Sequence, residues 1–427
     1  MAASEPEHGY IEEVESLNDY RPGGYHPIQI DHRLHERYRI VHKLGHGTFS
    51  TVWLAIDERT SNYVAVKGGT ADADTKEVEI LSRLTTGVSD RSQAAPEASM
   101  MIPTVMGRFS LDGPNGTHPC LVTAPARCSL IAAKEASDSR LFQLDVAWSL
   151  AAQLAMAVSF VHSQGYAHGD LHLGNLLLQL PHSFNDLSID QLYSKIGAPK
   201  LKPVIRLDKP SASPAAGVPS HAVPPVWLGI ASDKITLKEA KLLLTDFGVA
   251  FRPSDKSRFD SYTPLVIRAP EAFCEPTTPL SFASDIWSLA CIIFELFAHR
   301  SLIDGTFFAP QDEITAQQIH LQGLLPSDWW HNWEQRAKWF DEAGGSLENE
   351  RDIWRWDRRF GQWVQEPRQH FGMTVVDEEE KAALLEMLQC MLAWRPSDRP
   401  DAAAVLNMTW MKKWALPAYE GSRKDCV

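Results

Sequence analysis

The sequence predicts an α+β fold in two parts, an antiparallel β-sheet with one helix followed by a mostly helical region. From Tyr38 onward, short apolar runs alternate with turn residues, which is the pattern of an antiparallel meander. Residues 72–84 then have the charge and apolar spacing of a single helix. Beyond Arg127 the pattern becomes helical, and the stretch around Leu150 and Leu154 places its apolar residues on one face.

The composition is that of an ordinary globular protein. Of 427 residues, 44% are apolar and 22% are charged, which argues against wholesale disorder and against a fibrous repeat. The net charge of −13 argues against nucleic acid or an anionic membrane as the main partner, since both are bound mainly through Lys and Arg. An acidic protein is compatible with a basic peptide partner.

Cysteine usage and the N-terminal segment bear on the compartment. The cysteines are scattered without a C-x-x-C pair, so we expect reduced thiols rather than a disulfide framework or a zinc module. The N-terminal segment is acidic and lacks the basic-then-apolar pattern of a secretion signal. The longest apolar run, Ile286–Ala298, contains Ser288 and Glu295 and is expected to form a buried helix. We therefore expect a soluble intracellular protein that is cytoplasmic, nuclear or both.

Changes in composition suggest the organisation of the chain. Residues 1–37 are polar and punctuated by Gly and Pro, and are expected to form an N-terminal extension. The sheet part covers 38–126 and the helical part covers 127–420. An insertion at 181–240 is rich in Pro, Ser and Ala and is expected to be a flexible spacer within the helical part. A second inserted region, at about 301–380, is expected to be helical.

Tryptophans concentrate in the second insertion. Seven of the fourteen tryptophans fall between Trp329 and Trp363. We expect them to pack the interior of a helical subdomain.

A glycine-rich segment and a strand lysine suggest a phosphate site. The segment 45–50 (GHGTFS) lies between two strand-like runs, and glycines let backbone amides approach a polyphosphate closely. Lys67 follows one hairpin later on an apolar strand, where a lysine costs free energy unless it meets an anion. Glu77, three residues before Ile80 on the expected helix, is placed to hold the lysine, and Glu79 competes with it. Alone, each feature also fits a plain hairpin turn or an edge-strand lysine.

The segment 168–175 (HGDLHLGN) follows the amphipathic helix, and Leu-Thr-Asp-Phe-Gly follows at 244–248. In the H-x-D-x-x-x-x-N pattern, the carboxylate of Asp170 can receive a hydroxyl proton and the amide oxygen of Asn175 can ligate a metal. Asp246 can bridge the metal and the phosphates. Mg²⁺ favours hard oxygen ligands, so one Asp, one Asn and phosphate oxygens suffice.

Together these residues resemble a eukaryotic-type protein kinase, from Tyr38 to about Trp414. Further family motifs are Arg-Ala-Pro-Glu at 268–271, Asp-Ile-Trp-Ser at 285–288 and Arg-Pro-Ser-Asp-Arg-Pro at 395–400. The resemblance implies the two-lobed protein kinase fold, with an antiparallel N-lobe sheet plus one helix, a hinge, and a mostly helical C-lobe.

The resemblance also implies structural and adenine-binding roles. In the family, the glutamate of Ala-Pro-Glu, here Glu271, pairs with a late arginine, here Arg399. The aspartate before Ile-Trp-Ser, Asp285, braces the catalytic-loop backbone. Thr123 would be the gatekeeper, and the hinge near 124–126 would bind adenine.

Within the kinases the chain resembles the SR-protein-specific kinases, which phosphorylate serines in Arg/Ser repeats. YRPGGYHP at 20–27 precedes the domain, and GPNGTHPC at 113–120 leads toward the hinge. Ser50 replaces the third glycine of the glycine-rich loop. The spacer at 181–240 separates the catalytic loop from Asp-Phe-Gly, and Arg268 before Ala-Pro-Glu suits the broader group.

This resemblance implies ATP and Mg²⁺ as cofactors and a basic, Arg/Ser-rich protein as the substrate. Asp170 would orient and deprotonate the acceptor hydroxyl, Lys67 held by Glu77 would grip the α- and β-phosphates, and Asn175 and Asp246 would bind Mg²⁺. We expect a monomer with no direct nucleic-acid or membrane partner. The implied nucleotide-binding residues are Leu44, Gly45, His46, Gly47, Ser50, Val52, Ala65, Lys67, Thr123, Ala124 and Ala126.

One departure from the family concerns activation. Position 169 is Gly where many kinases have an arginine that receives an activation-loop phosphate. SR-protein kinases also lack this arginine, so we expect activity without such a switch. Ser254, Ser257 and Ser261 are accordingly expected to be ordinary loop serines.

Other departures keep two alternatives open. His172 stands where a lysine usually touches the transferring phosphate, and a neutral imidazole supplies a hydrogen bond but little charge. A similar loop occurs in aminoglycoside- and choline-type phosphotransferases, so a small-molecule phosphotransferase is one alternative, opposed by the Ala-Pro-Glu segment and Arg399. A catalytically weak pseudokinase or scaffold is the other, because 263–267 has Ile267 for a common Tyr and no Thr five residues before Ala269.

Acidic side chains could attract an Arg-rich substrate. The run 377–380 (DEEE) and the pair Asp312 and Glu313 are candidates for a docking surface. Both could instead be solvated acids near a helix N-terminus.

Overall fold

The structure is a computed structural model that describes residues 7–86, 97–208, 214–305 and 309–424. Parts of the expected extension (1–6) and of the two insertions (209–213 and 306–308), and also Cys426, lie outside the described residues. The chain divides into two compact units. Unit 1 consists of Met1–Gly87, Pro103–Arg127 and Gln179–Leu228, and unit 2 of Val88–Ile102, Cys128–Leu178 and Gly229–Val427.

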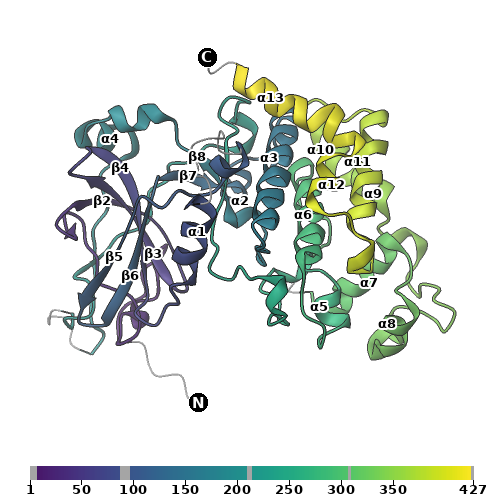
Figure 1. The fold of residues 1–427 in the computed structure, drawn as a ribbon, viewed down its shortest axis with the longest axis horizontal. Coiled ribbons are helices and arrows are strands. Elements are labelled where there is room, and N and C mark those ends of the chain that lie inside the picture. Colours follow the sequence, from purple (N-terminus) through teal and green to yellow (C-terminus); the bar gives the residue numbers. More distant parts are fainter. Residues whose placement is uncertain (1–6, 87–96, 209–213, 306–308, 425–427) are drawn as a thin grey trace. The chain divides into compact units, whose positions relative to one another are not determined.

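Unit 1 is built on an antiparallel sheet with the strand order β1-β2-β3-β4-β6-β5 (Figure 1). Apolar side chains that alternate along the strands form its core, with Ile40, Trp53, Val64 and Val122 all buried. Helix α1 follows β4. The bounds are β1 Arg33–Leu34, β2 Tyr38–Gly47, β3 Ser50–Asp57, β4 Asn62–Gly69, α1 Lys76–Thr86, β5 Gly107–Gly113 and β6 Gly116–Thr123.

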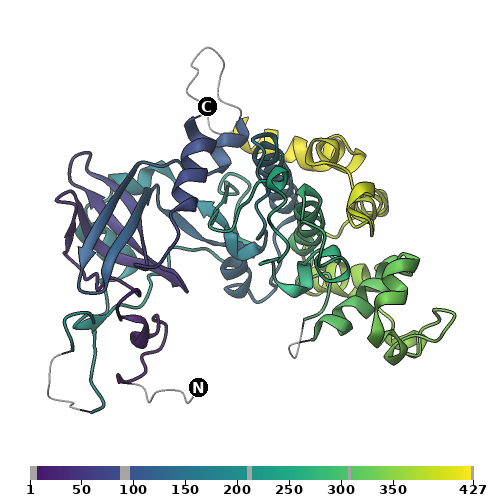
Figure 2. The same ribbon diagram turned by 60° about the horizontal axis from the view of Figure 1, so that its bottom comes forward.

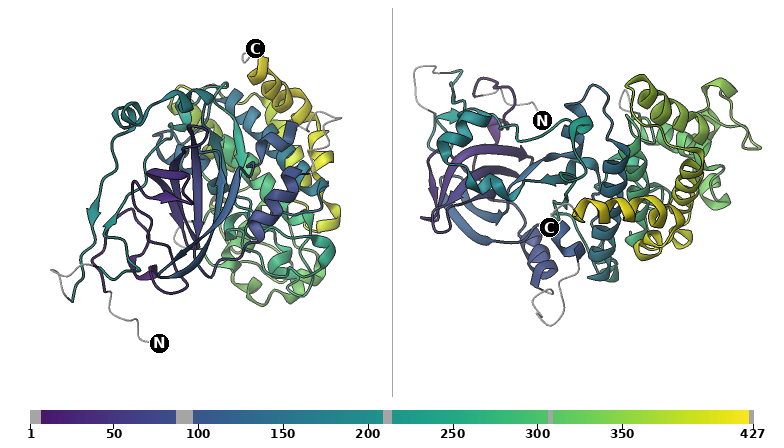
Figure 3. Two further views of the ribbon diagram at one scale, coloured as in Figure 1. Left: turned by 60° about the vertical axis from the view of Figure 1, so that its left-hand side comes forward. Right: turned by 90° about the horizontal axis from the view of Figure 1, so that it is seen from above.

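The first insertion differs from our expectation. Its residues up to Leu228 belong to unit 1, with the sheet, and not to the helical part. Helix α4 (Ile189–Ile196) begins with a capping box at Ser188, and its buried Leu192 packs with Val41 and Leu54. Figure 3 shows this segment running along the sheet, where the Tyr193 hydroxyl donates to Val41 O at 2.9 Å. Apolar residues between the prolines thus fasten a segment whose composition suggested a linker.

The N-terminal extension packs in the same unit. His8 forms an isolated β-bridge with Arg206, and Figure 2 shows the two segments side by side. Within the insertion, β9 (Lys202–Pro203) pairs with β10 (His221–Ala222). A small apolar cluster joins the extension to this hairpin; its buried members are Leu17, Tyr20, Tyr25, Val204 and Ala222.

Unit 2 is mostly helical and packs around α3 (Leu144–Ser163), which α6, α12 and α13 contact. By length and apolar composition α3 could cross a membrane, but 78% of its apolar stretch is buried inside the protein, as in a core helix. It is therefore a longer apolar candidate than Ile286–Ala298, most of which forms the buried helix α6. The bounds are α2 Leu130–Glu135, α5 Glu271–Cys274, α6 Phe282–Phe297, α11 Glu378–Met391, α12 Ala402–Leu406 and α13 Leu416–Lys424.

A short three-stranded sheet, of which Leu176–Leu178 and Leu242–Leu244 belong to unit 2, carries the polar motifs of the helical part. Its strand order is β11-β8-β7, with bounds Leu242–Leu244, Leu176–Gln179 and Ala126–Ser129. Strands β8 and β11 are antiparallel. The segment 168–175 therefore leads into one strand, and the segment at 244–248 leaves its neighbour.

The second insertion forms helices packed by aromatic rings, as we expected. Trp329 and Trp333 are buried with Phe340, and Trp354 stacks on Trp363 with ring centroids 5.4 Å apart. The bounds are α7 Gln311–Gln322, α8 Ser327–Asn332, α9 Trp356–Phe360 and α10 Glu366–His370.

The α+β class is confirmed, since an antiparallel sheet with one helix forms unit 1 and helices dominate unit 2.

Candidate active site

The glycine-rich segment is the tip of the β2–β3 hairpin. Gly47 pairs with Ser50, and the exposed Thr48 and Phe49 make the turn. Neither Gly45 nor Gly47 has a positive φ, and a Cβ built on either would meet no described atom within 4 Å. The chain's own packing therefore does not require these glycines. Open space in front of backbone amides is what a polyphosphate needs.

Lys67 lies in the middle of β4, between Val52 on β3 and Leu121 on β6. Its Nζ forms an ion pair with Glu77 Oε2 on α1 at 2.7 Å, and both side chains are mostly buried. Glu79 is exposed on the same helix. Of the two candidate acids, the structure pairs the lysine with Glu77.

The other expected nucleotide-binding residues of unit 1 lie on neighbouring strands. Leu44 and Val52 are partly buried on β2 and β3. Ala65 on β4 is buried and is the register partner of Thr123 at the end of β6. Ala124 follows directly, and its carbonyl accepts a hydrogen bond from the Thr123 hydroxyl at 3.2 Å. His46 is exposed on the hairpin and Ala126 begins β7.

In unit 2, a buried carboxylate supports the segment 168–175. Asp285 on α6 accepts the backbone N–H of His168 at 2.7 Å and that of Gly169 at 2.9 Å. Burial opposes its charge, but the hydrogen bond from His162 and these further contacts hold the pKa of Asp285 below its ordinary value. Burial also lowers the pKa of His168, whose Nε2 lies 3.0 Å from Thr245 O. Helix α6 thus holds the loop in place through Asp285.

Asp170 has two differently placed carboxylate oxygens. Oδ2 accepts a hydrogen bond from Asn175 Nδ2 at 3.2 Å, and the same amide nitrogen donates to the Asp170 carbonyl at 2.9 Å. Oδ1 is buried and has no hydrogen-bond partner among the described residues. Both bonds from Asn175 use its nitrogen, so neither occupies the amide oxygen that would ligate a metal.

His172 lies beside Asp170. Its Nδ1 accepts the backbone N–H of Gly174 at 3.1 Å, which assigns the proton of the neutral ring to Nε2. Nε2 is 3.6 Å from Asp170 Oδ2. The histidine therefore faces the carboxylate and supports the loop, besides occupying the position of a lysine.

Asp246 is brought next to this loop by its neighbour Thr245. The Thr245 amide and hydroxyl both donate to the Asn175 carbonyl, at 2.9 and 3.0 Å. Asp246 itself has φ +64°, and the buried Phe247 packs edge-on against His168. Unit 2 thus gathers Asp170, Asn175 and Asp246 at one end of its small sheet.

The donors in this group fit a magnesium ion. Asp and Asn oxygens, completed by phosphate oxygens and water, are ligands that Mg²⁺ prefers. In the described ranges we find no cluster of three or more His, Cys, Asp or Glu side chains that could hold a metal, so a zinc-type site is not indicated there.

Gly169 is required by the fold. Its φ is +76°, and a Cβ would lie 3.1 Å from a ring carbon of Phe251. Arg258 lies over the rings of Phe251 and Tyr262, and its guanidinium donates to Val249 O at 3.0 Å. Aromatic and backbone contacts thus hold the segment from Val249 to Tyr262.

The hydroxyl of Thr263 donates to Gly169 O at 3.2 Å. The sequence has no threonine five residues before Ala269, but this threonine, six residues before it, contacts the catalytic loop.

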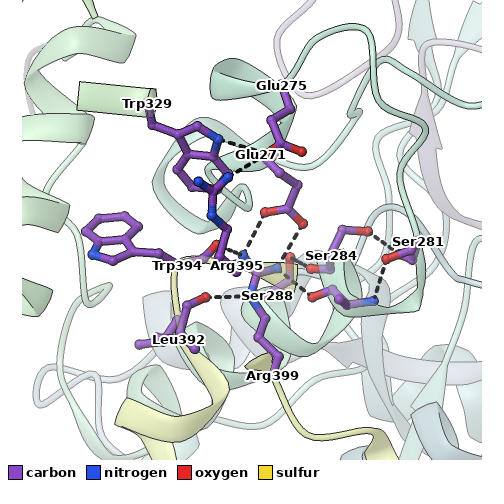
Figure 4. Close-up of polar contacts among 12 residues, drawn as sticks. Glu271, Glu275, Ser281, Ser284, Ser288, Trp329, Leu392, Trp394, Arg395 and Arg399 are labelled. Atoms are coloured by element: carbon purple, nitrogen blue, oxygen red, sulfur yellow. Dashed lines mark hydrogen bonds and ion pairs between the residues drawn. The ribbon is translucent and has the colours of Figure 1, made fainter. Parts of the chain in front are cut away.

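Figure 4 shows the buried ion pair of unit 2. Arg399 donates to both carboxylate oxygens of Glu271 at 2.8 and 2.7 Å, and also to the carbonyls of Ala283 and Trp394. Nearby, Glu275 accepts from both Trp329 and Arg395, at 2.9 and 2.8 Å. The resemblance to the kinases predicted the pair of Glu271 with Arg399, but nothing in the sequence predicted the contacts of Glu275.

The acids of the run at 377–380 have partners within the protein. The Asp377 side chain caps α11 by accepting the Glu380 amide at 2.8 Å. Glu380 is buried and accepts the indole N–H groups of Trp148 and Trp410. Asp377, Glu378 and Glu379 are exposed, and lysines pair with the last two of them. The cap and the buried glutamate favour the alternative that these acids serve the helix start, and docking at this run stays a prediction.

The two residues of the second acidic candidate, Asp312 and Glu313, have different surroundings. Asp312 accepts the indole N–H of Trp333 at 2.7 Å and belongs to the packing of the insertion. Glu313 lines a cavity of about 450 Å³ with three further acids and three tryptophans. The acids are Asp304, Glu313, Glu348 and Asp352, and the tryptophans are Trp339, Trp354 and Trp363. Arg300 and Arg359 also line it, and Arg300 pairs with Asp304 at 3.2 Å.

Comparison with known families matches residues 38–189 and 232–411 to the protein kinase domain. The chain belongs to the protein kinase family. The gap in the match falls on the insertion, most of which packs in unit 1. The expectation of a two-lobed kinase fold is thereby confirmed.

Curated relatives define the subfamily. The serine/threonine-protein kinase SRPK of Physarum polycephalum is 26% identical over 93% of this chain and 91% of its own length. The kinase SKY1 of Saccharomyces cerevisiae is 32% identical over 39% of this chain and 23% of its own. Human SRSF protein kinase 3 is 30% identical over 39% of this chain and 30% of its own. This kinase is an ATP-dependent serine/threonine protein kinase of the SR-protein-kinase-like subfamily, and ATP and a divalent metal are its general requirements.

Proposed function

We propose that this kinase transfers the γ-phosphate of ATP, with Mg²⁺, to serine hydroxyls in Arg/Ser-rich proteins, as a monomer in the cytoplasm, the nucleus or both. The relatives named for SR-type substrates favour this substrate class.

The buried Oδ1 of Asp170 is the observation that supports transfer most directly. A buried carboxylate oxygen without a donor is costly unless a ligand supplies one. A serine hydroxyl would donate to this carboxylate and pass its proton to it as the hydroxyl oxygen bonds to the γ-phosphorus. The bond from the γ-phosphorus to the β–γ bridging oxygen would break, and ADP would leave. Asn175 and His172 hold the other side of Asp170 and fix its orientation.

The remaining roles follow from the residues described above. Lys67, held by Glu77, would grip the α- and β-phosphates, and the hairpin at 45–50 would cover them. Asn175 and Asp246 would hold Mg²⁺, which when bound neutralises charge on the phosphates. The protein then contributes positioning and electrostatic stabilisation, which suffice for phosphoryl transfer.

Activity would need no activation-loop phosphate. Phe251 occupies the space beside Gly169, and Arg258 packs against aromatic rings and would not be needed to bind a phosphate. Ser254 and Ser257 are exposed on this segment and would be ordinary loop serines, as would Ser261.

The cavity around Glu313 is the best candidate for holding an arginine of the substrate. Carboxylates bind a guanidinium through charge-assisted hydrogen bonds, and tryptophan faces stack on its plane. Four acids against two arginines leave this cavity negative.

Transfer to defined acceptors tests the proposal. The purified full chain would be given radiolabelled ATP with an Arg/Ser peptide, a generic basic protein or amino alcohols. We expect transfer chiefly to the peptide, reduced roughly 10²–10⁴-fold in Asp170→Ala and strongly in Lys67→Met. Transfer to amino alcohols alone would indicate the small-molecule phosphotransferase, and nucleotide binding without transfer would indicate the scaffold.

The docking role has its own test. Glu313→Gln with Glu348→Gln should raise the KM for the Arg/Ser peptide and flatten its salt dependence, with kcat nearly unchanged. Glu378→Gln with Glu379→Gln, which removes the same charge from the helix start, should change neither. An equal effect of both pairs would refute the docking role of the cavity.

A further inference from the structure

The tip of the glycine-rich hairpin is held from outside the sheet by one buried side chain. The hydroxyl of Tyr25, in the N-terminal extension, lies 2.6 Å from Gly47 O and 3.0 Å from Thr48 O. The next carbonyl, Phe49 O, accepts the Thr70 amide at 2.9 Å. The carbonyl edge of the tip is therefore bonded within unit 1.

Tyr25, in the segment 20–27 (YRPGGYHP), is held by the segment 113–120 (GPNGTHPC). Asn115 Nδ2 donates to Tyr25 O at 2.7 Å, and the Gly23 amide donates to Asn115 O at 2.8 Å. Next in the chain, the ring of His26 packs edge-on against His118, with centroids 4.9 Å apart. The segment 20–27 thus packs on the segment 113–120.

The insertion completes this support. Asn115 Nδ2 also donates to Gly217 O at 2.7 Å, so one amide group joins the extension to the insertion. A Cβ at Gly217 would lie 2.3 Å from Asn115 Oδ1, and a Cβ at Gly24 would lie 1.8 Å from Asp19 O. Both glycines are required by close packing around Tyr25.

A buried ion pair ties the extension to the strand that leads into the tip. Lys43 on β2 pairs with Glu15, which also accepts from the Tyr20 hydroxyl. Burial opposes the charge of Glu15, but Lys43 keeps its pKa below the ordinary value. Burial, with the charges of Asp19 and Glu15, raises the pKa of Tyr25 to about 12, so its hydroxyl remains a donor at neutral pH.

We propose that Tyr25 is a positioning residue of the kinase reaction: its hydroxyl, presented by the extension and the insertion together, holds the glycine-rich loop ready for the phosphates of ATP. This inference rests on the loop's proposed role in covering those phosphates. A loop held before binding loses less conformational freedom when the nucleotide arrives. The N-terminal extension and most of the insertion lie outside the matched kinase domain, and both would then contribute to the binding of ATP.

The test compares two hydroxyl deletions in the full-length chain. Tyr25→Phe removes the bonds to the loop and keeps the buried ring. Tyr193→Phe is the matched control, because its hydroxyl donates to Val41 O on the same strand, away from the tip. Three measurements apply to both: hydrogen–deuterium exchange of 44–53 without nucleotide, the Kd of ATP with Mg²⁺ by calorimetry, and steady-state kinetics with a generic basic protein.

For Tyr25→Phe we expect faster exchange at the loop, and about a fivefold rise in the Kd and KM for ATP, as one lost hydrogen bond would give. The KM for the acceptor protein and the unfolding temperature should match those of Tyr193→Phe. Unchanged exchange and Kd, or equal changes in both variants, would overturn the inference and leave the proposed function intact. A wild-type protein that binds no ATP would refute the proposed function and this inference with it.

Discussion

At the scale of single residues, the glycines separate into those that the fold needs and those that it does not. Gly169 combines a positive φ with a ring carbon of Phe251 only 3.1 Å from where a Cβ would lie, which is closer than ordinary van der Waals contact. Gly45 and Gly47 have neither constraint. Since nothing in the surrounding packing selects glycine in the hairpin, a ligand that needs the exposed backbone explains it better.

Gly169→Ala should lower both stability and kcat more than the matched change Gly165→Ala. Both glycines have positive φ, +76° and +82°, so the backbone strain of about 1–2 kcal/mol is shared. Only at Gly169 would the new methyl group crowd Phe251, whereas at Gly165 it meets no described atom within 4 Å. Thermal unfolding and kcat measure the difference. Equal losses in both variants would show that Phe251 places no constraint on the catalytic loop.

Asp57 makes stability depend on pH. Its carboxylate accepts two hydrogen bonds from Arg37, at 2.8 and 2.7 Å, which lower its pKa from 3.8 to about 2. Because the folded pKa is depressed, the stabilisation is complete above the ordinary pKa and is lost as the pH falls from about 4 to about 2. Asp57→Asn should therefore unfold at a lower temperature at pH 7, and the difference should shrink steadily below about pH 4 and be largely lost near pH 2. The exposed Asp260→Asn should show no such trend.

At the scale of elements, buried polar pairs connect segments distant in sequence. Glu271 begins α5, and Arg399 precedes α12; their side chains are 7% and 0% exposed. Such a pair is weak evidence of net stabilisation, but losing one partner leaves a buried charge without its counterion. It fixes the geometry of the segment after the Ala-Pro-Glu motif.

Arg399→Leu should destabilise the protein by about 3–5 kcal/mol, because Glu271 then stays buried and unpaired. Glu271→Leu combined with Arg399→Leu should recover part of the loss, since no orphaned charge remains. Denaturant unfolding of the two variants measures the difference. A double variant less stable than Arg399→Leu alone would contradict this account.

The insertion behaves as part of the sheet unit. Leu192 on α4 is fully buried against β2 and β3, so Leu192→Ala should cost about 2–5 kcal/mol. Leu201, in the same insertion, is 53% exposed, and Leu201→Ala should change the free energy of unfolding by less than about 0.5 kcal/mol. Chemical denaturation followed by tryptophan fluorescence distinguishes them. A flexible spacer would tolerate both changes equally.

At the scale of the whole molecule, the charge of −13 acts on a basic substrate at long range. The kcat/KM for an Arg/Ser peptide should therefore fall as salt rises, because the Debye length shortens from about 10 Å at 0.1 M to about 3 Å at 1 M. A neutral serine peptide should show little dependence. Steady-state rates at several ionic strengths test this expectation, and equal salt dependence for both peptides would contradict it.

Local spacing in the sequence predicted the pieces of the site well. Ten residues from a strand lysine to a helix glutamate singled out Lys67 and Glu77, and the structure pairs them at 2.7 Å. The catalytic-loop motif likewise singled out Asp170 and Asn175, and the structure adds a hydrogen bond between them that the motif did not predict. The sequence assigned no role to Tyr25, because nothing local shows which carbonyls a distant hydroxyl will reach.

The sequence by itself determined the family, the order of the motifs, and the residue types that phosphoryl transfer needs, because those depend on short spacings along strands, helices and loops. Tertiary structure decided which acids remain free and where the insertion belongs. From the sequence, Glu380 is expected to be a surface charge, but in the structure it is buried and hydrogen-bonded to Trp148 and Trp410. Proline-rich composition hides the apolar residues that fasten 179–228 to the sheet. Burial and long-range pairing are properties of the folded chain, and composition does not contain them.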